Sequence, residues 1–301
     1  MPLRIVKASE PMTISNIVLT VYAQPGLGKS TLGFTAEKAL LLDFDKGAYR
    51  AAKRGDSVPV AAWADVQGMT ADDLKDYSTV IVDTAGRALD ALAADIIAAN
   101  SKAGRGDGSL TLQGFGTLKS RFAQWQGFLR SLGKDLVLVC HMDEQKNGDE
   151  TMERIDAQGA SKNEIYKSSD AMCRIRLDGK DGRYLDFNPR AGGFGKNPAQ
   201  LPAIAFPHPD ENPHFLGDVI QRIKDSINKI TAQQAQATTQ SSEWEDAVKE
   251  ADSLQAVNVL VGLSKERKLN KAQKTVLADK AKSLGFTFDK ATGAYVEAKA
   301  A

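Results

Sequence analysis

Residues 17–31 read IVLTVYAQPGLGKST, and this stretch decides the fold class. An apolar run from Ile17 to Tyr22 is followed by a glycine-containing loop, Ala23–Thr31, and then by a segment with helical periodicity. Strand, loop and helix in this order, with Lys-Ser directly after the second glycine, are typical of a phosphate-binding loop. The glycines let backbone N–H groups turn toward a polyphosphate.

The loop predicts a site for ATP and Mg²⁺. Lys29 is expected to reach the β and γ phosphates, and the Ser30 hydroxyl to ligate the magnesium ion. Ala23 stands where the strict motif has glycine, but a small residue still fits there. The residues predicted to bind the nucleotide are Gln24, Pro25, Gly26, Leu27, Gly28, Lys29, Ser30 and Thr31.

Short β-branched runs alternating with helical segments predict an α/β fold with a mainly parallel sheet between helices. The further strands are expected at Ala39–Phe44, Thr79–Asp83 and Asp135–His141. Helices are expected at Lys29–Lys38, Arg87–Ala99 and Thr117–Leu132. Arg174–Leu177 and Arg183–Phe187 flank a turn sequence and predict a hairpin that adds an antiparallel edge.

The rest of the chain predicts three regions: a core over residues 1–230, a linker over 231–242 and a small module over 243–301. Ser101–Gly116 is rich in Gly, Ser and charge, so we expect a long mobile loop there. A helix is expected over Leu216–Ile230, followed by the low-complexity stretch Thr231–Ser242. The periodicity after Glu243 indicates a module of about three helices.

Composition narrows the classes of partner. The 301 residues are 42% hydrophobic and carry 39 Lys and Arg against 38 Asp and Glu, a net charge of +1. Such a balance forces no nucleic-acid partner, so any DNA site must be local. Because no apolar stretch reaches the roughly 18 residues of a membrane span, a cytoplasmic protein without a membrane partner is expected, with Cys140 and Cys173 reduced.

Polar residues follow the predicted strands at the sheet edge where ligands bind in open α/β folds. Asp83 ends the strand Thr79–Asp83 and is the expected second magnesium ligand, acting through water. Either Asp43 or Asp45 faces the γ-phosphate, the alternative role being a cap for the following helical segment. His141 either senses the γ-phosphate or only ends its strand. His208 and His214 lack the further ligands that a metal site needs.

Residues 14–230 resemble the RecA-like ATPase core. The resemblance rests on the phosphate loop, on Leu41–Asp45, on Thr79–Asp83 and on Leu136–His141. More narrowly, the chain is similar to the phage nucleotide-binding, single-strand annealing proteins of the fourth Sak group. That resemblance implies a phage-encoded protein acting in the bacterial cytoplasm, which assembles into rings or filaments with ATP at the subunit interfaces.

The resemblance also implies roles for further residues. Asp45 matches the family's water-activating acid, although the family has Glu there. Lys196-Asn197 resembles a Lys-Asn pair that contacts ATP on the neighbouring subunit, and Arg190 is a second candidate for that role. The predicted catalytic residues are therefore Asp45, Lys29, His141, Lys196 and Arg190.

In RecA-like recombinases two mobile loops hold single-stranded DNA. The matching segments here are Ser101–Gly116 and residues 142–167. Cations in such loops can follow a phosphate backbone, and Phe115 or Tyr166 could stack on bases. The DNA-binding residues predicted on this basis are Lys146, Arg154, Lys162, Lys167 and Phe115.

Two functions follow as hypotheses. The first is an ATP-dependent, DNA-stimulated ATPase that binds and anneals single strands, with itself and a host single-strand-binding protein as further partners. The second is a P-loop switch or motor that acts on a protein partner without DNA, which the near-neutral charge favours. A small-molecule kinase ranks last because Arg105, Arg121 and Arg130 are dispersed rather than clustered in a lid.

Overall fold

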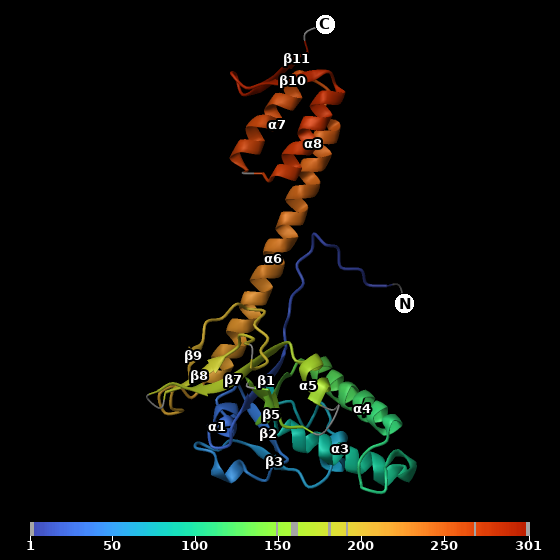
Figure 1. Ribbon diagram of the computed structural model, residues 1–301, viewed down its shortest axis with the longest axis vertical. Helices are drawn as coiled ribbons and strands as arrows, with labels where there is room; N and C mark the ends of the chain where they lie inside the picture. Colours follow the sequence, from blue (N-terminus) through green and yellow to red (C-terminus); the bar gives the residue numbers. More distant parts are fainter. Residues whose placement is uncertain are drawn as a thin grey trace. The chain divides into compact units, whose positions relative to one another are not determined.

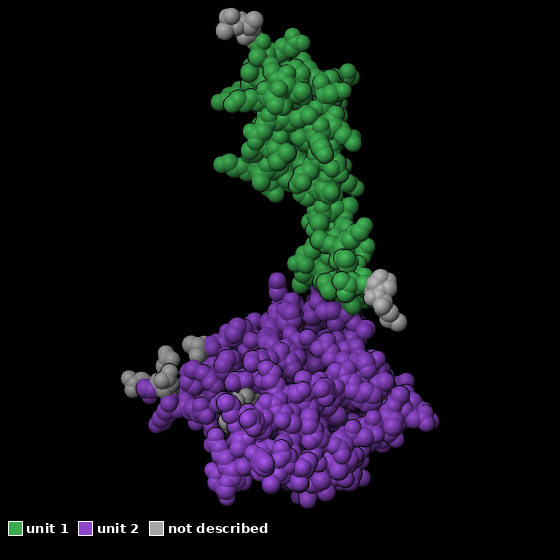
Figure 2. Space-filling model, turned by 90° about the vertical axis from the view of Figure 1, so that its right-hand side faces the viewer, with its two compact units in different colours: residues 1–13, 228–301 green, residues 14–227 purple. Residues whose placement is uncertain are grey.

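A twisted β-sheet between two layers of helices forms the first part of the chain in the computed structural model (Figure 1). The structure describes residues 3–148, 150–157, 162–179, 182–190, 192–267 and 269–298. Two compact units divide the chain, one of residues 14–227 and the other of residues 1–13 and 228–301 (Figure 2). The predicted boundaries of the core, linker and module stay a prediction.

Nine strands make up the main sheet within the described residues, in the order β3-β2-β4-β5-β1-β7-β8-β9, with β6 paired to β5. The strands are β1 (Val18–Ala23), β2 (Ala39–Asp43), β3 (Ser57–Pro59), β4 (Thr79–Asp83), β5 (Asp135–Asn147), β6 (Glu150–Ile155), β7 (Ala171–Leu177), β8 (Arg183–Asp186) and β9 (Ile204–Ala205). The pairs from β3 to β7 along this order are parallel, whereas β6, β8 and β9 pair antiparallel. The expected fold class, a mainly parallel sheet with an antiparallel edge, is confirmed.

Helices cover both faces of the sheet because the central strands are apolar on both sides. The 310 turns and helices are α1 (Lys29–Gly33), η1 (Ala48–Arg50), α2 (Ala64–Gln67), α3 (Ala85–Ala99), η2 (Ser101–Ala103), α4 (Leu112–Ser131), α5 (Lys162–Ser168) and α6 (Phe215–Glu250). One core cluster joins α3 and α4 to one face, and a second joins α1 and the first turns of α6 to the other. The buried strands β1, β4 and β5 lie between these layers.

The predicted loop Ser101–Gly116 is shorter than expected and covers only residues 104–111. Its first residues form η2, and α4 begins at Leu112 behind Thr111, whose Oγ1 accepts a hydrogen bond from the Gly114 amide. A Cβ added at Gly114 would lie 2.5 Å from the Ala103 carbonyl oxygen, so this glycine allows a close backbone contact inside a helix. Gly114, one of the glycines that suggested a loop, is therefore a packing residue.

Three predicted element boundaries also change. α1 ends at Gly33 rather than Lys38, and α6 runs on through residues 231–242 to Glu250. The stretch 231–242 is rich in Ala and Gln, which favour helix, and buries Ala235. β5 does not end at His141 but continues to Asn147 and forms an antiparallel arm with β6. In the predicted β7–β8 hairpin, the turn residues Lys180 and Asp181 lie outside the described residues.

The unit of residues 1–13 and 228–301 has its own core, built around Trp244 from the last turns of α6. α7 (Leu254–Glu266) and α8 (Lys271–Ser283) pack there, as the helical periodicity predicted. A hairpin of β10 (Phe286–Asp289) and β11 (Ala294–Glu297) was not predicted. Its signal is present in Thr287, Phe288, Tyr295 and Val296, which are strand-forming residues on both sides of a turn.

Candidate nucleotide-binding site

The phosphate loop follows β1. This strand is buried along its whole length and pairs with β5 on one side and β7 on the other. Gly26 and Gly28 have φ angles of 82° and 86°, in the left-handed region that glycine adopts without a steric cost. Gly28 precedes α1, and the Leu32 amide donates to its carbonyl at 2.8 Å. The predicted order of strand, loop and helix is confirmed.

Lys29 folds back over its own loop. Its Nζ donates to the carbonyl oxygens of Ala23 at 3.0 Å and Gln24 at 2.9 Å, and the side chain is buried. Burial lowers the pKa of Lys29, while the nearby Asp83 carboxylate opposes that shift. A phosphate anion in the loop would offer this buried ammonium group a charged partner in place of two neutral carbonyls.

Ser30 and Asp83 lie together at the carboxyl ends of β1 and β4. The Ser30 hydroxyl donates to Asp83 Oδ2 at 2.5 Å. Burial raises the pKa of the Asp83 carboxyl, and the Ser30 hydrogen bond opposes this rise. A hydroxyl and a carboxylate are oxygen ligands of the kind that phosphate-bound Mg²⁺ takes from a protein.

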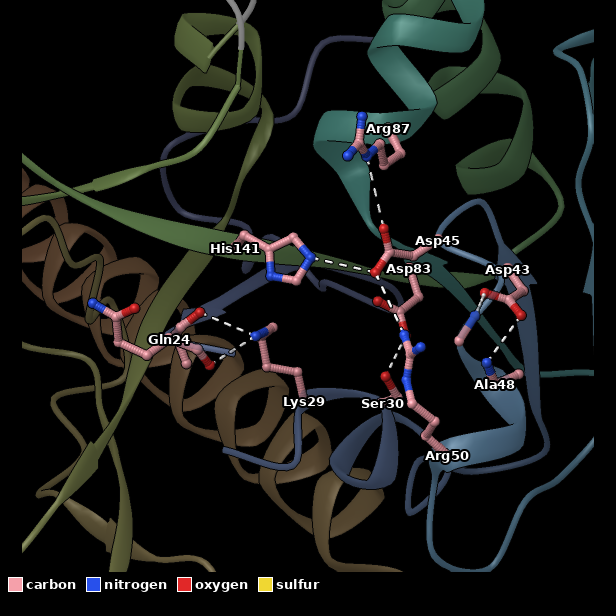
Figure 3. Close-up of polar contacts among 12 residues, drawn as sticks. Gln24, Lys29, Ser30, Asp43, Asp45, Ala48, Arg50, Asp83, Arg87 and His141 are labelled. Atoms are coloured by element: carbon pink, nitrogen blue, oxygen red, sulfur yellow. Dashed lines mark hydrogen bonds and ion pairs between the residues drawn. The ribbon is translucent and has the colours of Figure 1, made fainter. Parts of the chain in front are cut away.

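The two acids after β2 have different surroundings (Figure 3). Asp43 accepts hydrogen bonds from the Gly47 and Ala48 amides, both at 2.9 Å, so it caps the turn into η1. Asp45 instead lies near His141 and two arginines, with its Oδ2 3.4 Å from His141 Nε2. Of the two alternatives for these acids, Asp43 takes the capping position and Asp45 the cavity position.

His141 comes from the middle of β5, where it pairs in register with Ala23 at the start of the phosphate loop. Its Nε2 faces Asp45, while its Nδ1 is buried without a hydrogen-bond partner among the described residues. An orphaned buried nitrogen of this kind is costly unless a ligand or water completes it. His141 thus joins the acid after β2 to the phosphate-loop strand.

Three arginines at the site were not predicted. Arg50 Nη2 and Arg87 Nε lie 4.0 Å and 3.7 Å from the Asp45 carboxylate. Arg183 extends from β8 to the loop, where its Nη1 is 3.4 Å from the Leu27 carbonyl oxygen and its guanidinium lies over the Phe206 ring. Arg87 could have been noticed in the sequence, because it follows the predicted magnesium ligand Asp83 by four residues. Arg183 could not, because only the register of β8 brings it to the phosphate loop.

These side chains surround a cavity of about 530 Å³. This volume lies within the usual range of small-molecule sites. Glycines, one lysine, two arginines and two acids therefore converge on a space that suits a polyphosphate with a magnesium ion. The lining residues are Pro25, Gly26, Gly28, Lys29, Ser30, Thr31, Asp45, Gly47, Arg50, Ala51, Ala52, Asp83, His141 and Arg183.

Lys196 and Arg190 do not line this cavity. Lys196 Nζ donates to the Ser169 carbonyl at 2.7 Å, and Arg190 Nε lies 2.9 Å from Asp186 Oδ2. Asp186 also pairs with Arg174 and Arg176, so Arg190 belongs to a charge network across β7 and β8. Within one chain both cations have partners, and their role toward a neighbouring subunit stays a prediction.

The predicted DNA-binding residues are spread over four elements. Lys146 is exposed on β5, Arg154 stacks on the Phe194 ring from β6, and Lys162 and Lys167 lie on α5. Phe115 differs from the expectation: it lies in the first turns of α4 and packs against the core, so it is not a free loop aromatic. Tyr166 packs against Phe194 with the two rings tilted, and its hydroxyl accepts a hydrogen bond from the Ile155 amide.

Comparison with known families fits this arrangement. A family model described as an AAA domain matches residues 15–199, which is more than half of the 301-residue chain. The chain therefore belongs to the AAA domain family and is a P-loop ATPase. A search of curated proteins found no match. In the described part of the chain, no helix has both the length and the apolarity that crossing a membrane requires.

Proposed function

We propose that this P-loop ATPase binds single-stranded DNA in an ATP- and magnesium-dependent way and promotes strand annealing or recombination. The narrower resemblance to single-strand annealing proteins of the fourth Sak group supports this proposal. ATP and Mg²⁺ would bind in the cavity around Lys29, with Ser30 on the metal, Asp83 acting on it through water and Asp45 orienting the attacking water.

One observation carries the proposal: the β-strand β5 connects the nucleotide site to the β5–β6 arm, which is a candidate DNA-binding element. β5 holds His141 beside Asp45, and five residues further along the same strand it presents the exposed Lys146. A strand is stiff along its length, so a shift of His141 on ATP binding moves the β5–β6 arm. ATP thereby controls the position of the DNA-contacting cations.

Assembly would complete the site. The resemblance places Lys196, with Arg190, against ATP on a neighbouring subunit. For this, the Lys196 amine has to leave the Ser169 carbonyl, and Arg190 has to leave Asp186. A cation supplied across an interface stabilises charge that develops on the γ-phosphate and couples turnover to assembly.

The test compares DNA binding by a triple-alanine variant with DNA binding by a double-alanine control. Lys146→Ala, Lys162→Ala and Lys167→Ala together remove three candidate phosphate contacts, and Lys75→Ala with Lys229→Ala is the control on exposed lysines elsewhere. With ATP and Mg²⁺, the triple variant should bind a labelled oligothymidylate more weakly and lose up to roughly 2 from the salt slope, about 0.7 per contact. An unchanged slope would remove these lysines from the DNA site.

A second function, action on a protein partner without DNA, is favoured by the charge of the arm. Residues 143–154 include five acids (Asp143, Glu144, Asp149, Glu150 and Glu153) but only two bases (Lys146 and Arg154). An acidic arm repels a phosphate backbone and attracts a basic protein surface. ATP turnover that ignores oligothymidylate over a range of low salt concentrations would favour this second function.

A further inference from the structure

The unit of residues 1–13 and 228–301 contains a cavity of its own, of about 620 Å³. It lies between α7, α8 and the β10–β11 hairpin. None of its lining residues belongs to the nucleotide site. They are Val261, Ser264, Lys265, Lys271, Lys274, Thr275, Leu277, Ala278, Phe288 and Tyr295.

The walls of this cavity are held in place by hydrogen bonds between elements. The Asn258 side chain donates to the Tyr295 carbonyl at 2.9 Å and accepts from the Tyr295 amide at 2.7 Å, which fixes the hairpin to α7. Trp244 Nε1 donates to the Gln273 carbonyl at 3.0 Å and fixes α8 to α6. Asn270 and Gln273 form a capping box at the start of α8. The cavity is therefore preformed, which lowers the entropy cost of binding.

The floor of the cavity is apolar and one aromatic ring is open to solvent. Val261, Leu277 and Tyr295 are buried, whereas Phe288 is 49% exposed and packs edge-on against Tyr295 with 5.1 Å between ring centroids. An exposed phenylalanine over an apolar floor offers contact area to an apolar side chain of a ligand.

The rim is basic. Lys265, Lys271 and Lys274 are exposed, and none of the three amines forms an ion pair with a carboxylate in the described part of the chain. Lys265 Nζ makes a long 3.4 Å contact with the Gly293 carbonyl. Burial and then the Asp279 carboxylate raise the pKa of the Tyr295 hydroxyl. Negative groups of a ligand therefore fit at the lysine rim, away from Asp279.

From this combination we propose that the cavity binds an acidic peptide segment of a partner protein, with an apolar side chain between Phe288 and the apolar floor and carboxylates at the three lysines. Charge complementarity at the rim selects an anion. The apolar floor favours a peptide over a nucleic acid, because a strand of bases would need a series of exposed aromatic rings. Of the two aromatic lining residues, Phe288 is exposed and Tyr295 is buried. The site does not depend on the proposed action on DNA.

The test uses the full chain and a fluorescein-labelled ten-residue peptide, which has eight alternating Asp and Ser residues and ends in Leu-Phe. Fluorescence anisotropy at low salt measures its Kd. We expect Lys271→Glu with Lys274→Glu to weaken binding by roughly tenfold or more, and Phe288→Ser to do the same. Lys249→Glu with Lys282→Glu reverses two exposed lysines that do not line the cavity and should change Kd by less than about twofold.

Two comparisons can overturn the proposal. A peptide that ends in Ser-Ser should bind at least about tenfold more weakly, because the apolar anchor is gone; equal binding would mean that attraction is purely electrostatic and that the cavity is not the site. Oligothymidylate should not displace the peptide, and displacement would assign the lysine rim to nucleic acid. Thermal melts of each variant establish that the module is folded before its Kd is interpreted.

Discussion

Asp43 and Asp45 lie two positions apart but have different tasks in the structure. Asp43 holds two backbone amides, and Asp45 lies with His141 at the nucleotide cavity. The sequence left these two roles open because the spacing between the acids and the strand end is almost the same. The backbone turn at Gly47 decides the assignment, since it brings the Gly47 and Ala48 amides within reach of Asp43 and not of Asp45.

Asp45→Asn tests the assignment. We expect the kcat of ATP hydrolysis to fall by roughly 100-fold or more, because a neutral amide, unlike a carboxylate, neither takes a proton from the attacking water nor polarises it with a negative charge. The nucleotide Kd should change by less than about threefold. The matched control, Asp43→Asn, weakens a cap, so it should lower the melting temperature at a cost of about 1–2 kcal/mol while the folded protein keeps its turnover. The opposite pattern would exchange the roles of the two acids.

The two glycines of the loop permit a second comparison. Both have positive φ, but a Cβ added at Gly28 would lie 2.5 Å from Arg183 Nη1, whereas one at Gly26 would have nothing within 4 Å. Without nucleotide, Gly26→Ala should therefore show only backbone strain, about 1 kcal/mol of unfolding free energy. Gly28→Ala should show that strain and also displace Arg183, with a nucleotide Kd at least several-fold weaker than for Gly26→Ala. Calorimetric titration with ADP compares the two, and equal affinities would argue against a role for Arg183.

Asp83 links stability to pH. Burial raises its pKa above the ordinary carboxyl value, so the folded chain without nucleotide holds this proton more tightly than the unfolded chain does. The tighter binding of this proton adds to the free energy of unfolding. That contribution is complete below the ordinary carboxyl pKa and is lost as pH rises through the raised pKa. Asp83→Asn should therefore melt at a higher temperature than the unsubstituted chain at pH 7, and the difference should shrink toward pH 4. A difference that stays constant over this range would mean that Asp83 does not titrate as described.

At the scale of elements, the strands and the phosphate loop could be predicted and several connections could not. Apolar runs such as Val80–Val82 carry their own signal, because a strand buried on both faces needs such a run. The start of α4 was missed because Gly114 looks like a loop residue in the sequence. Glycine is needed there because the backbone of Ala103 packs closely against it, and no local sequence pattern indicates that contact. For the same reason the position of Arg183 could not be read from its neighbours in sequence.

α6 provides the prediction at this scale. The segment 231–242 has linker composition but lies inside a helix that ends at Glu250. Its amides should therefore be protected in hydrogen exchange measured by mass spectrometry. Thr238→Pro should remove protection on both sides of residue 238, because proline breaks the helix at a cost of about 3 kcal/mol or more, while Thr238→Ala should keep it. Rapid exchange of 231–242 in the unsubstituted chain would contradict the continuous helix.

At the scale of the whole molecule, the residues proposed for ATP chemistry all come from the unit of residues 14–227. The other unit holds a separate preformed cavity with a basic rim. In our proposals the chain combines an ATPase unit with a unit that binds a partner peptide. Membership of the AAA domain family covers the first of these units only, since the match ends at residue 199.

The most direct measurement is ATP hydrolysis by the unsubstituted chain and by Lys29→Ala, each with and without a single-stranded oligonucleotide. Low salt is essential because phosphate contacts weaken steeply as salt rises. We predict that turnover rises with the oligonucleotide. It should be lost in Lys29→Ala, because the variant lacks the buried amine that Lys29 places at the phosphate loop. Turnover that persists in Lys29→Ala would contradict the assignment of the nucleotide site, and turnover indifferent to the oligonucleotide would contradict the coupling to DNA.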